Sequence, residues 1–331
     1  MRAILCNGSG GPEVMAPGEV PPPAPDAGEV LIRVAASAVN RADLAQRSGS
    51  YPPPPGESEI LGLEVSGRIE ALGEGVETAR VGDRVMTLVG GGAYAEFTTA
   101  PACTLMPVPD RFDLVTAGAI PEVFLTAYLN VFREAALRQG EIVLIHGGAS
   151  GVGTAGIQLC RRLRDATVIV TVGSDDKAEA CRALGADLAI VYKREDFADR
   201  VKDATEKHGA DVILDHIGGG YLADNLRCLA TNGRLVIIGV MGGSKAELNV
   251  GQLMVRRQRI IGSVLRARSV AEKAELTRAF RAEVWPLLDD GRLEPVIHTR
   301  VPLAEAAEAH RLVGANANTG KVLLVVDEGL D

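Results

Sequence analysis

The 331-residue sequence contains five cysteines and five histidines, and neither residue type forms a metal-binding pattern. The spacing includes no Cys-x-x-Cys pair and no neighbouring set of Cys and His, which are the usual sources of zinc ligands. The sequence therefore predicts no bound metal. The cysteines are odd in number and scattered, so we expect reduced thiols in a cytoplasmic protein. They are Cys6, Cys103, Cys160, Cys181 and Cys228.

Long apolar runs and an excess of positive charge are also missing. We find no apolar stretch that approaches the roughly 18–20 residues of a membrane span, and the N-terminal MRAILCNG is typical of a strand rather than a signal peptide. The net charge of −8 argues against a nucleic-acid or anionic-membrane partner. The length is sufficient for two domains with full cores. We therefore expect neither a nucleic-acid nor a membrane partner.

The stretch from 141 to 161, EIVLIHGGASGVGTAGIQLCR, predicts a dinucleotide site. An apolar strand, Ile142–Ile145, stops at a glycine cluster, and an amphipathic helix pattern follows at once. Gly156 lies inside that helix and is expected to allow close packing against the strand. The turn before it should hold the phosphates, because bare backbone and the first helical N–H groups meet the anion there. The residues of this turn are Gly148, Ala149, Ser150, Gly151, Val152 and Gly153.

The strand that follows the glycine turn ends without the acid that usually binds the ribose 2′-hydroxyl of NAD. Its tip reads Gly173-Ser174-Asp175-Asp176-Lys177. Gly173 leaves space, Ser174 offers a hydroxyl and Lys177 a cation, which together suit a 2′-phosphate. Two interpretations of Asp175 and Asp176 remain open, since either is the ribose acid or both begin the next helix. We favour the helix interpretation and predict NADPH as the cofactor, although Lys177 also fits a solvated helix residue.

The pattern of apolar runs predicts two regions. The first third has short β-runs broken by glycine and proline, typical of a small β-barrel, and helical periodicity starts at Leu114. From Glu141 to about Leu265, strands alternate with helices, which predicts a doubly wound parallel sheet. A last strand, Val322–Val326, lies far from its expected partners near the N-terminus, so the nucleotide region is an insertion. The six predicted strands of that region are Ile142–Ile145, Val168–Val172, Leu188–Val191, Val212–Asp215, Leu235–Val240 and Ile260–Leu265.

With these motifs in hand, the chain resembles the medium-chain dehydrogenase/reductase superfamily. It is most similar to the zinc-independent, zeta-crystallin-like quinone oxidoreductase branch, and within it to the tumour-suppressor-inducible type. The zinc-dependent relatives carry a catalytic Cys and a Gly-His-Glu where this chain has Asn40 and Gly62-Leu63-Glu64, so the ligand count for zinc fails. The blocks that carry the resemblance are Val39–Gly67, His146–Gly153, Ile213–Tyr221 and Thr319–Leu324.

The resemblance implies an α/β protein with two domains. A GroES-like β-barrel catalytic domain would comprise residues 1–118 and 299–331, and a Rossmann domain would comprise residues 119–298, with a cleft between them. It also implies transfer of a hydride, or of single electrons, from NADPH to a quinone in the cleft. Homodimers would form at the edge of the Rossmann sheet, around Ile260–Leu265. The basic cluster Arg256, Arg257 and Arg259 fits a solvated helix end or part of that contact.

Two residues near the N-terminus are the candidates for catalysis. Asn40 would hold the nicotinamide ribose or a carbonyl substrate, or else it only caps the helix that starts near Arg41. Tyr51, in SGSYPPPP, would donate a proton from its phenol, or else it only stacks on the substrate or closes a lid. A proton donor matters most for the alternative function, an NADPH-dependent enone or enoyl-thioester reductase. A further alternative is an NADPH-binding protein without turnover.

The remaining candidate residues would contact the cofactor. Tyr192 lies where the family contacts the 2′-phosphate, although it also fits a surface aromatic that caps the sheet. His146 and His216 end two strands, but such histidines are usually satisfied locally, so neither is proposed as catalytic. Loops around Tyr51–Ser58, Leu88–Tyr94 and Val123–Leu129 would set the acceptor specificity. The other predicted contacts are Ile217, Gly239, Met241, Ser263, Leu265 and Asn316, with Asn318 a weaker choice than Asn316.

Overall fold

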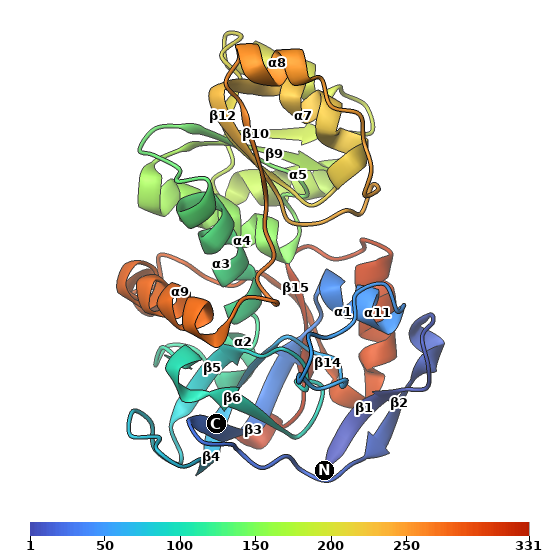
Figure 1. Cartoon of the computed structure of the whole chain (residues 1–331), viewed down its shortest axis with the longest axis vertical. Coiled ribbons are helices and arrows are strands. Elements are labelled where there is room, and N and C mark those ends of the chain that lie inside the picture. Colours follow the sequence, from blue (N-terminus) through green and yellow to red (C-terminus); the bar gives the residue numbers. More distant parts are fainter. Residues whose placement is uncertain (331) are drawn as a thin grey trace. The chain divides into compact units, whose positions relative to one another are not determined.

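A computed structural model describes residues 1–330 of the chain. The chain forms two compact units (Figure 1). Unit 1 comprises Met1–Leu125 and the chain from Arg266 onward, and unit 2 comprises Thr126–Leu265. These bounds differ from the predicted domain limits mainly at residues 266–298, which group with unit 1. Here helix α9 (Val270–Glu283) contacts the turn η2 (Ala102–Thr104), and Trp285 Nε1 donates a 2.9 Å hydrogen bond to the carbonyl oxygen of Pro107.

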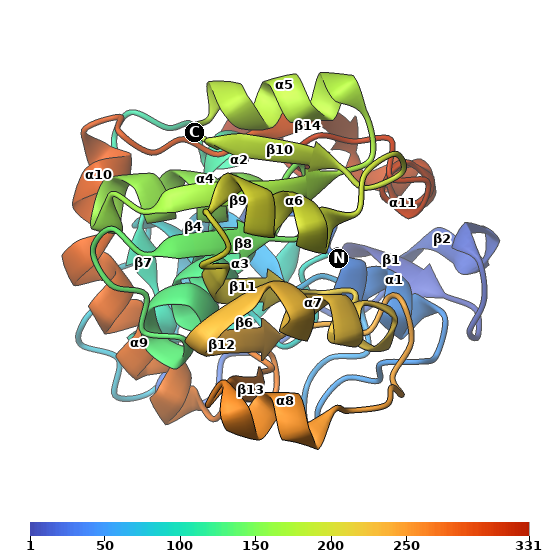
Figure 2. The same ribbon diagram turned by 90° about the horizontal axis from the view of Figure 1, so that it is seen from above.

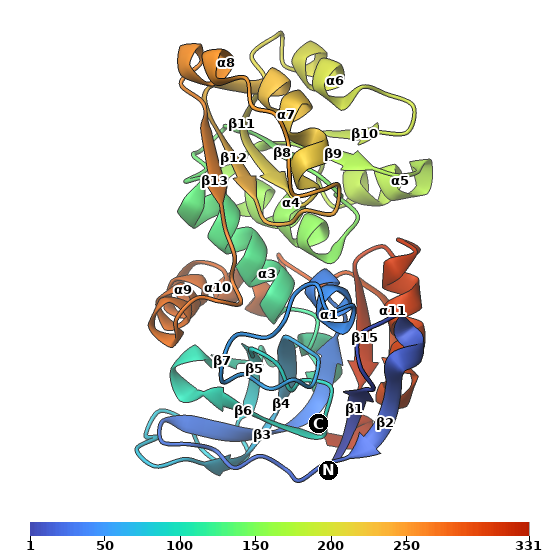
Figure 3. The same ribbon diagram turned by 45° about the vertical axis from the view of Figure 1, so that its right-hand side comes forward.

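Unit 1 is built on a sheet with the strand order β14-β15-β3-β4-β5-β7, and β6 also pairs with β3. The ten-residue strand β3 joins these parts, because its length gives it room to pair with β4, β6 and β15 along its two edges. Strands β1 and β2 form a separate ribbon beside α11 (Figure 3). The strands are β1 Arg2–Cys6, β2 Met15–Glu19, β3 Glu29–Ala38, β4 Glu64–Leu72, β5 Arg84–Leu88, β6 Phe97–Pro101, β7 Met106–Pro107, β14 Ile297–Pro302 and β15 Lys321–Val325.

Strand β15 confirms the expected return of the chain to its N-terminal region. It runs antiparallel to β3, with Leu323 opposite Ala38, and parallel to β14. Buried aliphatic side chains of β3 and β4 fill the core on one side, with Val30, Ile32 and Val65 almost fully enclosed. The helices and turns of unit 1 are η1 Pro12–Val14, α1 Arg41–Arg47, η2 Ala102–Thr104, α2 Leu114–Ala117, α3 Pro121–Ala127, α9 Val270–Glu283, α10 Trp285–Asp289, η5 Leu303–Glu305, α11 Ala306–Gly314 and η6 Glu328–Leu330.

Unit 2 is a six-stranded parallel sheet with the order β10-β9-β8-β11-β12-β13 (Figure 2). This order confirms the predicted doubly wound sheet. Two predicted ends were wrong, since β12 stops at Ile237 rather than Val240, and β13 stops at Gly262 rather than Leu265. Beyond these points the backbone turns away into the loops described below. The strands are β8 Ile142–Ile145, β9 Thr167–Val172, β10 Leu188–Val191, β11 Ala210–Asp215, β12 Leu229–Ile237 and β13 Arg259–Gly262.

The helices of unit 2 follow the strands in alternation, and the faces that they cover are apolar. The core joins Leu144, Ile169 and Ile213 of the sheet to Phe197 and Leu226 of the helices. The helices and turns are η3 Tyr128–Glu134, α4 Gly151–Arg164, α5 Asp175–Ala183, α6 Phe197–Ala204, η4 Gly218–Tyr221, α7 Leu222–Cys228 and α8 Val250–Val255.

One helical segment corrects the sequence analysis. Leu114–Glu134 is long and apolar enough to cross a membrane, contrary to the expectation that no such stretch exists. Most of its apolar window, 89%, is buried inside the protein, which accounts for its composition. It also contains residues 123–129, so the third predicted specificity loop is helical rather than a loop.

Candidate functional site

The predicted phosphate turn joins β8 to α4 in unit 2. Helix α4 begins at Gly151, so Gly148–Ser150 form the turn and Gly151–Gly153 form the first helical turn. Ser150 is the N-cap residue, and its Oγ accepts the N–H of Gly153 at 3.0 Å. The other N–H groups of a first turn have no acceptor within the helix. The start of α4 is therefore suited to an anion.

Glycine is required where the backbone of this turn comes close to itself. A Cβ atom added to Gly153 would lie 2.4 Å from the carbonyl oxygen of Gly147 and 2.5 Å from that of Gly148. Gly147 has a φ of +60°, and a Cβ there would lie 2.5 Å from the imidazole of His216. The turn is thus a cradle of bare backbone that a side chain would fill, which fits a pyrophosphate. Gly156 packs against β8 as expected, since its Cβ position is 3.0 Å from Ile145 Cδ1.

The tip of β9 supports the helix interpretation of the two acids. Ser174 is the N-cap residue of α5, and Asp175 and Asp176 lie in the first turn of that helix. The carboxylate of Asp175 accepts two hydrogen bonds from Arg194, at 2.6 and 2.7 Å. Arg194 was missed by the sequence analysis, and it neutralises an acid beside the predicted 2′-phosphate position. The hydroxyl of Tyr192 lies 3.3 Å from the Cβ position of Gly173, so these two predicted residues are adjacent.

Behind the glycine turn, His146 is fully buried in a chain of hydrogen bonds. Its Nε2 lies 2.7 Å from Asn225 Oδ1, and its Nδ1 lies 3.0 Å from Thr171 Oγ1. Because the amide nitrogen of Asn225 donates to Asp215 at 3.1 Å, we assign the proton of His146 to Nε2. Burial lowers the pKa of His146 to about 3, so the ring is neutral. His146 therefore supports the turn from behind and has no exposed nitrogen for catalysis.

The loops that follow β11 and β12 are bonded to each other. Asp215 Oδ1 accepts the N–H of Ile217 at 2.6 Å, and the carbonyl oxygen of Ile217 accepts the N–H of Gly242 at 2.7 Å. The N–H of Met241 donates to the carbonyl oxygen of His216 at 3.2 Å. Burial raises the pKa of Asp215 to about 6. The structure thus brings the predicted contacts Ile217 and Met241 together at the carboxyl ends of the strands, where such sheets bind ligands.

Ser263 follows β13 and is buried, and its hydroxyl has no hydrogen-bond partner among the described residues. Its N–H donates to the carbonyl oxygen of Ile237 at 3.1 Å, which fixes the residue beside β12. A buried hydroxyl without a partner is uncommon and is satisfied when a ligand supplies the missing bond. This orphaned group fits the predicted nicotinamide contact. Leu265 ends the same segment, half-buried.

In unit 1, Asn40 lies at the start of α1 inside a buried polar network. Its Oδ1 accepts a 2.6 Å hydrogen bond from Lys321 Nζ, and its Nδ2 donates to Glu64 Oε1 at 2.9 Å. Lys321 Nζ also lies 2.8 Å from Glu64 Oε1, and both of these side chains are at least 97% buried. Glu64 Oε2 accepts the N–H of Glu122 at 2.8 Å. Both ends of the Asn40 amide therefore already form hydrogen bonds within the network. A bond from this amide to a substrate would have to replace one of those hydrogen bonds.

The network continues from Asp43 toward the surface. Asp43 accepts N–H groups of Asn40 and Gly62, at 2.8 and 3.1 Å, and lies 3.2 Å from the Tyr94 hydroxyl. That hydroxyl is 3.0 Å from His310 Nε2, and His310 Nδ1 is 3.0 Å from Arg47. Burial raises the pKa of Asp43 to about 6 and lowers that of His310 to about 3. Both groups are thus held closer to their neutral forms than they would be in water.

We expect the substitution His310→Gln to make unit 1 less sensitive to acid. A histidine with a depressed pKa stabilises the fold above its ordinary pKa of 6.5, and this contribution is lost as the pH falls toward 3. The unfolding free energy of the wild type should therefore fall more steeply than that of the variant, by about 1.4 kcal/mol per pH unit in this window. Asp43 acts in the opposite sense in both proteins, because its raised pKa favours the folded state at low pH. Denaturation at several pH values, followed by Trp285 fluorescence, measures the two slopes, and parallel slopes would contradict the assignment.

Tyr51 lies in the irregular segment between α1 and β4. Its ring is half-buried, and the guanidinium carbon of Arg266 lies 5.4 Å from the ring centroid. Burial raises the pKa of Tyr51, so the phenol stays protonated at neutral pH. The predicted residue Asn316 lies elsewhere in unit 1, where its Oδ1 accepts a hydrogen bond from Arg41, next to Asn40 in the chain. Asn318 bonds locally, through Nδ2 to the carbonyl oxygen of Gly320 at 2.6 Å.

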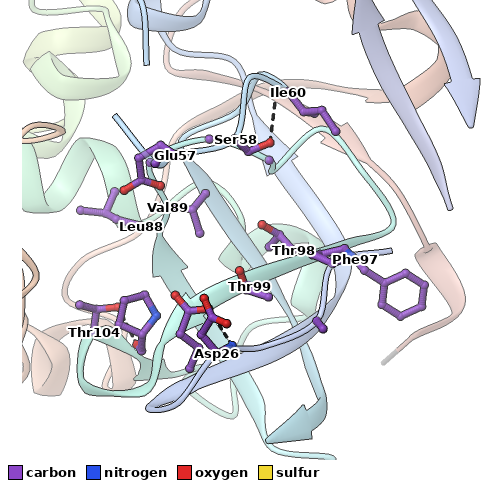
Figure 4. Close-up of a pocket in the computed structure, with 18 of the residues that line it drawn as sticks. Asp26, Glu57, Ser58, Ile60, Leu88, Val89, Phe97, Thr98, Thr99 and Thr104 are labelled. Carbon is purple, nitrogen blue, oxygen red and sulfur yellow. Dashed lines mark hydrogen bonds between the residues drawn. The ribbon is translucent and has the colours of Figure 1, made fainter. Parts of the chain in front are cut away.

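A cavity of about 560 Å³ opens in unit 1 (Figure 4). Two of the predicted specificity segments line it, through Pro55–Ser58 and Leu88–Gly92. Glu57, Asp26 and Lys273 give it a polar wall, and neither Asn40 nor Tyr51 belongs to its lining. The cavity therefore borders the predicted acceptor loops without containing the candidate catalytic residues.

Comparison with known proteins identifies the family. The family model described as "Alcohol dehydrogenase GroES-like domain" matches residues 26–110, and that described as "Zinc-binding dehydrogenase" matches residues 151–281. A quinone oxidoreductase of Rattus norvegicus is 33% identical over 330 residues, which cover 98% of each chain. The chain belongs to the medium-chain dehydrogenase/reductase superfamily, in its quinone oxidoreductase branch.

Solved structures agree with the assignment of this chain to the superfamily. An Escherichia coli quinone oxidoreductase complexed with NADPH is 28% identical, with a TM-score of 0.89 and coverage of 98% of this chain and 100% of the other. A structure described as an NAD-dependent alcohol dehydrogenase is 33% identical, with a TM-score of 0.87 and the same two coverages. The predicted combination of a GroES-like domain and a Rossmann sheet is thereby confirmed.

Proposed function

We propose that this protein is a zinc-independent, NADPH-dependent quinone oxidoreductase. The observation that carries the choice of NADPH is the tip of β9. There Gly173 and Ser174 replace the ribose acid, Tyr192 adds a hydroxyl, and Arg194 holds the nearby Asp175 in a two-bond ion pair. A 2′-phosphate bound there would meet hydroxyl groups and the cations of Lys177 and Arg194, and the Asp175 carboxylate beside it is paired with Arg194. The similar Escherichia coli quinone oxidoreductase was solved as a complex with NADPH, which agrees with this choice.

The remaining cofactor contacts follow from the same geometry. The cradle at the start of α4 would hold the pyrophosphate, and the bonded loops after β11 and β12 would hold the nicotinamide, together with the orphaned hydroxyl of Ser263. Asn40 and Asn316, in unit 1, are further proposed contacts. The proposed set is Asn40, Gly148, Ala149, Ser150, Gly151, Val152, Gly153, Gly173, Ser174, Lys177, Tyr192, Ile217, Gly239, Met241, Ser263, Leu265 and Asn316.

When bound, NADPH supplies the hydride or the single electrons of the reaction. The chain's own part is to hold the two reactants in register and to keep water away from them. A quinone needs little protonation at the moment of transfer, and Tyr51 remains available to return a proton to the reduced acceptor because its phenol is protonated. Zinc plays no part in this proposal. Among residues 1–330, no group of three or more His, Cys, Asp or Glu side chains is arranged to hold a metal ion.

The direct test is cofactor oxidation against a panel of acceptors, with a chelator present. The panel consists of a benzoquinone, a larger ortho-quinone and an alkyl vinyl ketone, each assayed with NADPH and with NADH. Chelator-resistant turnover of the quinones that prefers NADPH is the expected result. Faster turnover of the ketone, lost in Tyr51→Phe, would favour an enone reductase instead. Tight NADPH binding without any turnover would overturn the assignment as an active quinone reductase.

We expect Arg194→Met to weaken the preference for NADPH. The substitution removes a cation and releases the Asp175 carboxylate, which then repels the 2′-phosphate and accepts a bond from a ribose hydroxyl. The KM for NADPH should rise about 10-fold or more while the KM for NADH stays the same or falls. Arg200→Met is the matched control, because Arg200, which lies on α6, forms a similar exposed pair with Glu195. An equal rise for both cofactors would indicate a general effect on the fold.

We also propose that the protein is a cytoplasmic homodimer that forms at the β13 edge of unit 2. Strand β13 pairs with β12 along one side, and it lies with α8 at one margin of the sheet (Figure 2). The apolar side chains of this margin are exposed, with Val250 at 63%, Met254 at 70% and Val255 at 71%. An open strand edge beside an exposed apolar patch is a typical association surface. A second copy, related by a two-fold axis, would cover it.

Introducing charge into this margin should therefore give monomers. Val255→Asp places a carboxylate where a partner would bury an apolar side chain, so we expect the mass in solution to fall from about twice the 34.7 kDa chain mass to one chain. Light scattering after size exclusion measures this change. Val81→Asp, at a 63% exposed valine of unit 1, is the control and should leave the mass unchanged. A wild type that already elutes as one chain would contradict the dimer.

A further inference from the structure

Arg266 is a buried cation that forms no hydrogen bond or ion pair with a carboxylate among the described residues, and the carboxylates of Asp43 and Glu57 act on it only at longer range. It is 8% exposed, and its hydrogen bonds go to neutral oxygen atoms. Its Nε and Nη2 donate to the carbonyl oxygen of Gly90 at 2.8 and 2.5 Å, and Nη2 also donates to Gln46 Oε1 at 2.7 Å. Burial lowers the pKa of Arg266, and an arginine side chain stays protonated in proteins. A buried charge of this kind is costly unless a partner of opposite charge joins it.

One donor group of Arg266 is unused. Its Nη1 is sealed from solvent and has no hydrogen-bond partner among the described residues. A buried charged N–H group that lacks an acceptor costs more than a hydrogen bond contributes, so it calls for an acceptor that a bound molecule is able to supply. The ring of Tyr51 covers the guanidinium, at 5.4 Å from its central carbon. The guanidinium that carries the unused donor and the ring of Tyr51 are therefore neighbours.

Arg266 also connects the two predicted specificity loops. It contacts Tyr51 of the first loop and binds the backbone of Gly90 in the second. The carboxylate of Glu57 lies close to Gly90, since a Cβ on Gly90 would fall 1.9–2.3 Å from its atoms. Gly90 and Glu57 both line the cavity of unit 1 (Figure 4). The acceptor loops thus meet around one cation, and residues of both loops line the cavity.

We propose that the unused N–H of Arg266 binds the acceptor oxygen that becomes negative on reduction. This inference rests on the proposed function and specifies its substrate class: flat acceptors whose reduced form is a phenolate or an enolate, with an oxygen atom small enough to enter beside Tyr51. The cation then gains a directly bonded counter-charge, and the charge-assisted bond is strongest after transfer. The interaction favours the reduced acceptor over the neutral one, which is how a binding group accelerates a reaction.

Reduction of a quinone at this site requires one hydride and one proton. A quinone that accepts a hydride, which carries two electrons and one proton, becomes a hydroquinone monoanion, and NADPH becomes NADP⁺. The negative charge resides on the oxygen beside Arg266. One proton from Tyr51, replaced from water, or from water directly, completes the hydroquinone and ends the interaction with the cation. The neutral product then leaves.

The first experiment uses 4-nitrophenol as a coloured mimic of the phenolate and needs no substitution. The wild-type protein with NADP⁺ is titrated with 4-nitrophenol while absorbance reports its ionisation. We expect bound 4-nitrophenol to be half-ionised at a pH lower by about 1 to 3 than the free compound, as for an acid placed beside an arginine. Nitrobenzene, which cannot ionise, should bind more weakly. Binding of the neutral form alone, with no change in its ionisation, would overturn the proposal.

Two variants then locate the effect at Arg266. Arg266→Met removes the donors at similar length, and we expect about 10²- to 10³-fold lower kcat with quinones, since that is the usual effect of losing an oxyanion donor. Arg266→Lys keeps the charge and should recover part of both kcat and the ionisation change. Arg111→Met is the matched control, because Arg111 also lies over a ring, that of Phe112, but already pairs with Glu294.

The readouts separate this inference from the proposed function. Unchanged NADPH affinity and an unchanged Tm show that a variant is folded. If the wild type turns over quinones and folded Arg266→Met does so equally well, the inference fails and the function stands. If no quinone is reduced but 4-nitrophenolate binding still requires Arg266, the function fails and the anion site stands. Should Arg266→Met not fold, the wild-type ionisation result and Arg266→Lys decide.

Discussion

Lys321→Met is expected to lower the unfolding free energy of unit 1 by about 3–5 kcal/mol, the largest change in stability predicted for this protein. Lys321 and Glu64 form an ion pair at 2.8 Å in which the side chains are 3% and 0% exposed. Methionine fills much of the same volume, so little packing is lost, but Glu64 keeps a buried charge without its cation. The ammonium group also bonds the carbonyl oxygen of Val39 and the amide of Asn40, and both bonds disappear.

Trp285, the single tryptophan of the chain, lies in unit 1 and reports its unfolding in denaturant. The control is Lys207→Met, which removes an exposed pair with Asp203 and should have little effect. The double substitution of Lys321→Met with Glu64→Gln removes both charges and should recover part of the loss, because no charge is then left unpaired. If the double variant is no more stable than Lys321→Met alone, the buried charge is not the cause.

Gly153→Val is expected to weaken NADPH binding about 100-fold or more, equivalent to roughly 2.7 kcal/mol. A side chain at this position would meet two carbonyl oxygens of the turn, those of Gly147 and Gly148, at 2.4 and 2.5 Å. Backbone atoms cannot move aside as a flexible side chain does, so the cradle must open or the start of α4 must shift. In either case the first-turn N–H groups no longer converge on the phosphates.

NADPH fluorescence, titrated with wild type and variant, measures this loss of affinity. Gly262→Ala is the matched control in the same unit, since a Cβ on Gly262 meets nothing within 4 Å and its φ is not positive. We expect its affinity to equal that of the wild type. A Gly153→Val protein that binds NADPH as tightly as Gly262→Ala would show that the phosphates lie elsewhere.

The sequence predicts best those features that depend on neighbours in the chain. The glycine turn, the strands of unit 2 and the first-turn acids Asp175 and Asp176 follow from local periodicity and helix-start chemistry, and the structure confirms them. The ends of β12 and β13 were wrong because the apolar run continues into loops that are held by tertiary bonds, such as that from Gly242 to Ile217. Apolar periodicity alone does not mark where a strand leaves its sheet.

The polar pairs of the site are harder to predict, because their partners are distant in the chain. Lys321 and Glu64 are 257 residues apart, and each stands alone in an apolar or glycine-rich run. The motif around Lys321 was recognised without a role, although a lysine that begins a buried strand is itself a signal of a buried partner. Arg266 gave no such signal, since Gly90 and Gln46 meet it only through the fold. Whether a charged side chain is buried, and which partner it meets, therefore depends on residues that only the folded chain brings together.

The position of β15 in the chain affects how the protein folds during its synthesis on the ribosome. Unit 2 is continuous in the chain, whereas the sheet of unit 1 pairs β3, which precedes unit 2, with β15, which follows it. Unit 2 is therefore able to fold during synthesis, while one stretch of β3 waits with an open edge. A pause in translation between unit 2 and β15 would prolong the exposure of this edge of β3 and with it the risk of aggregation.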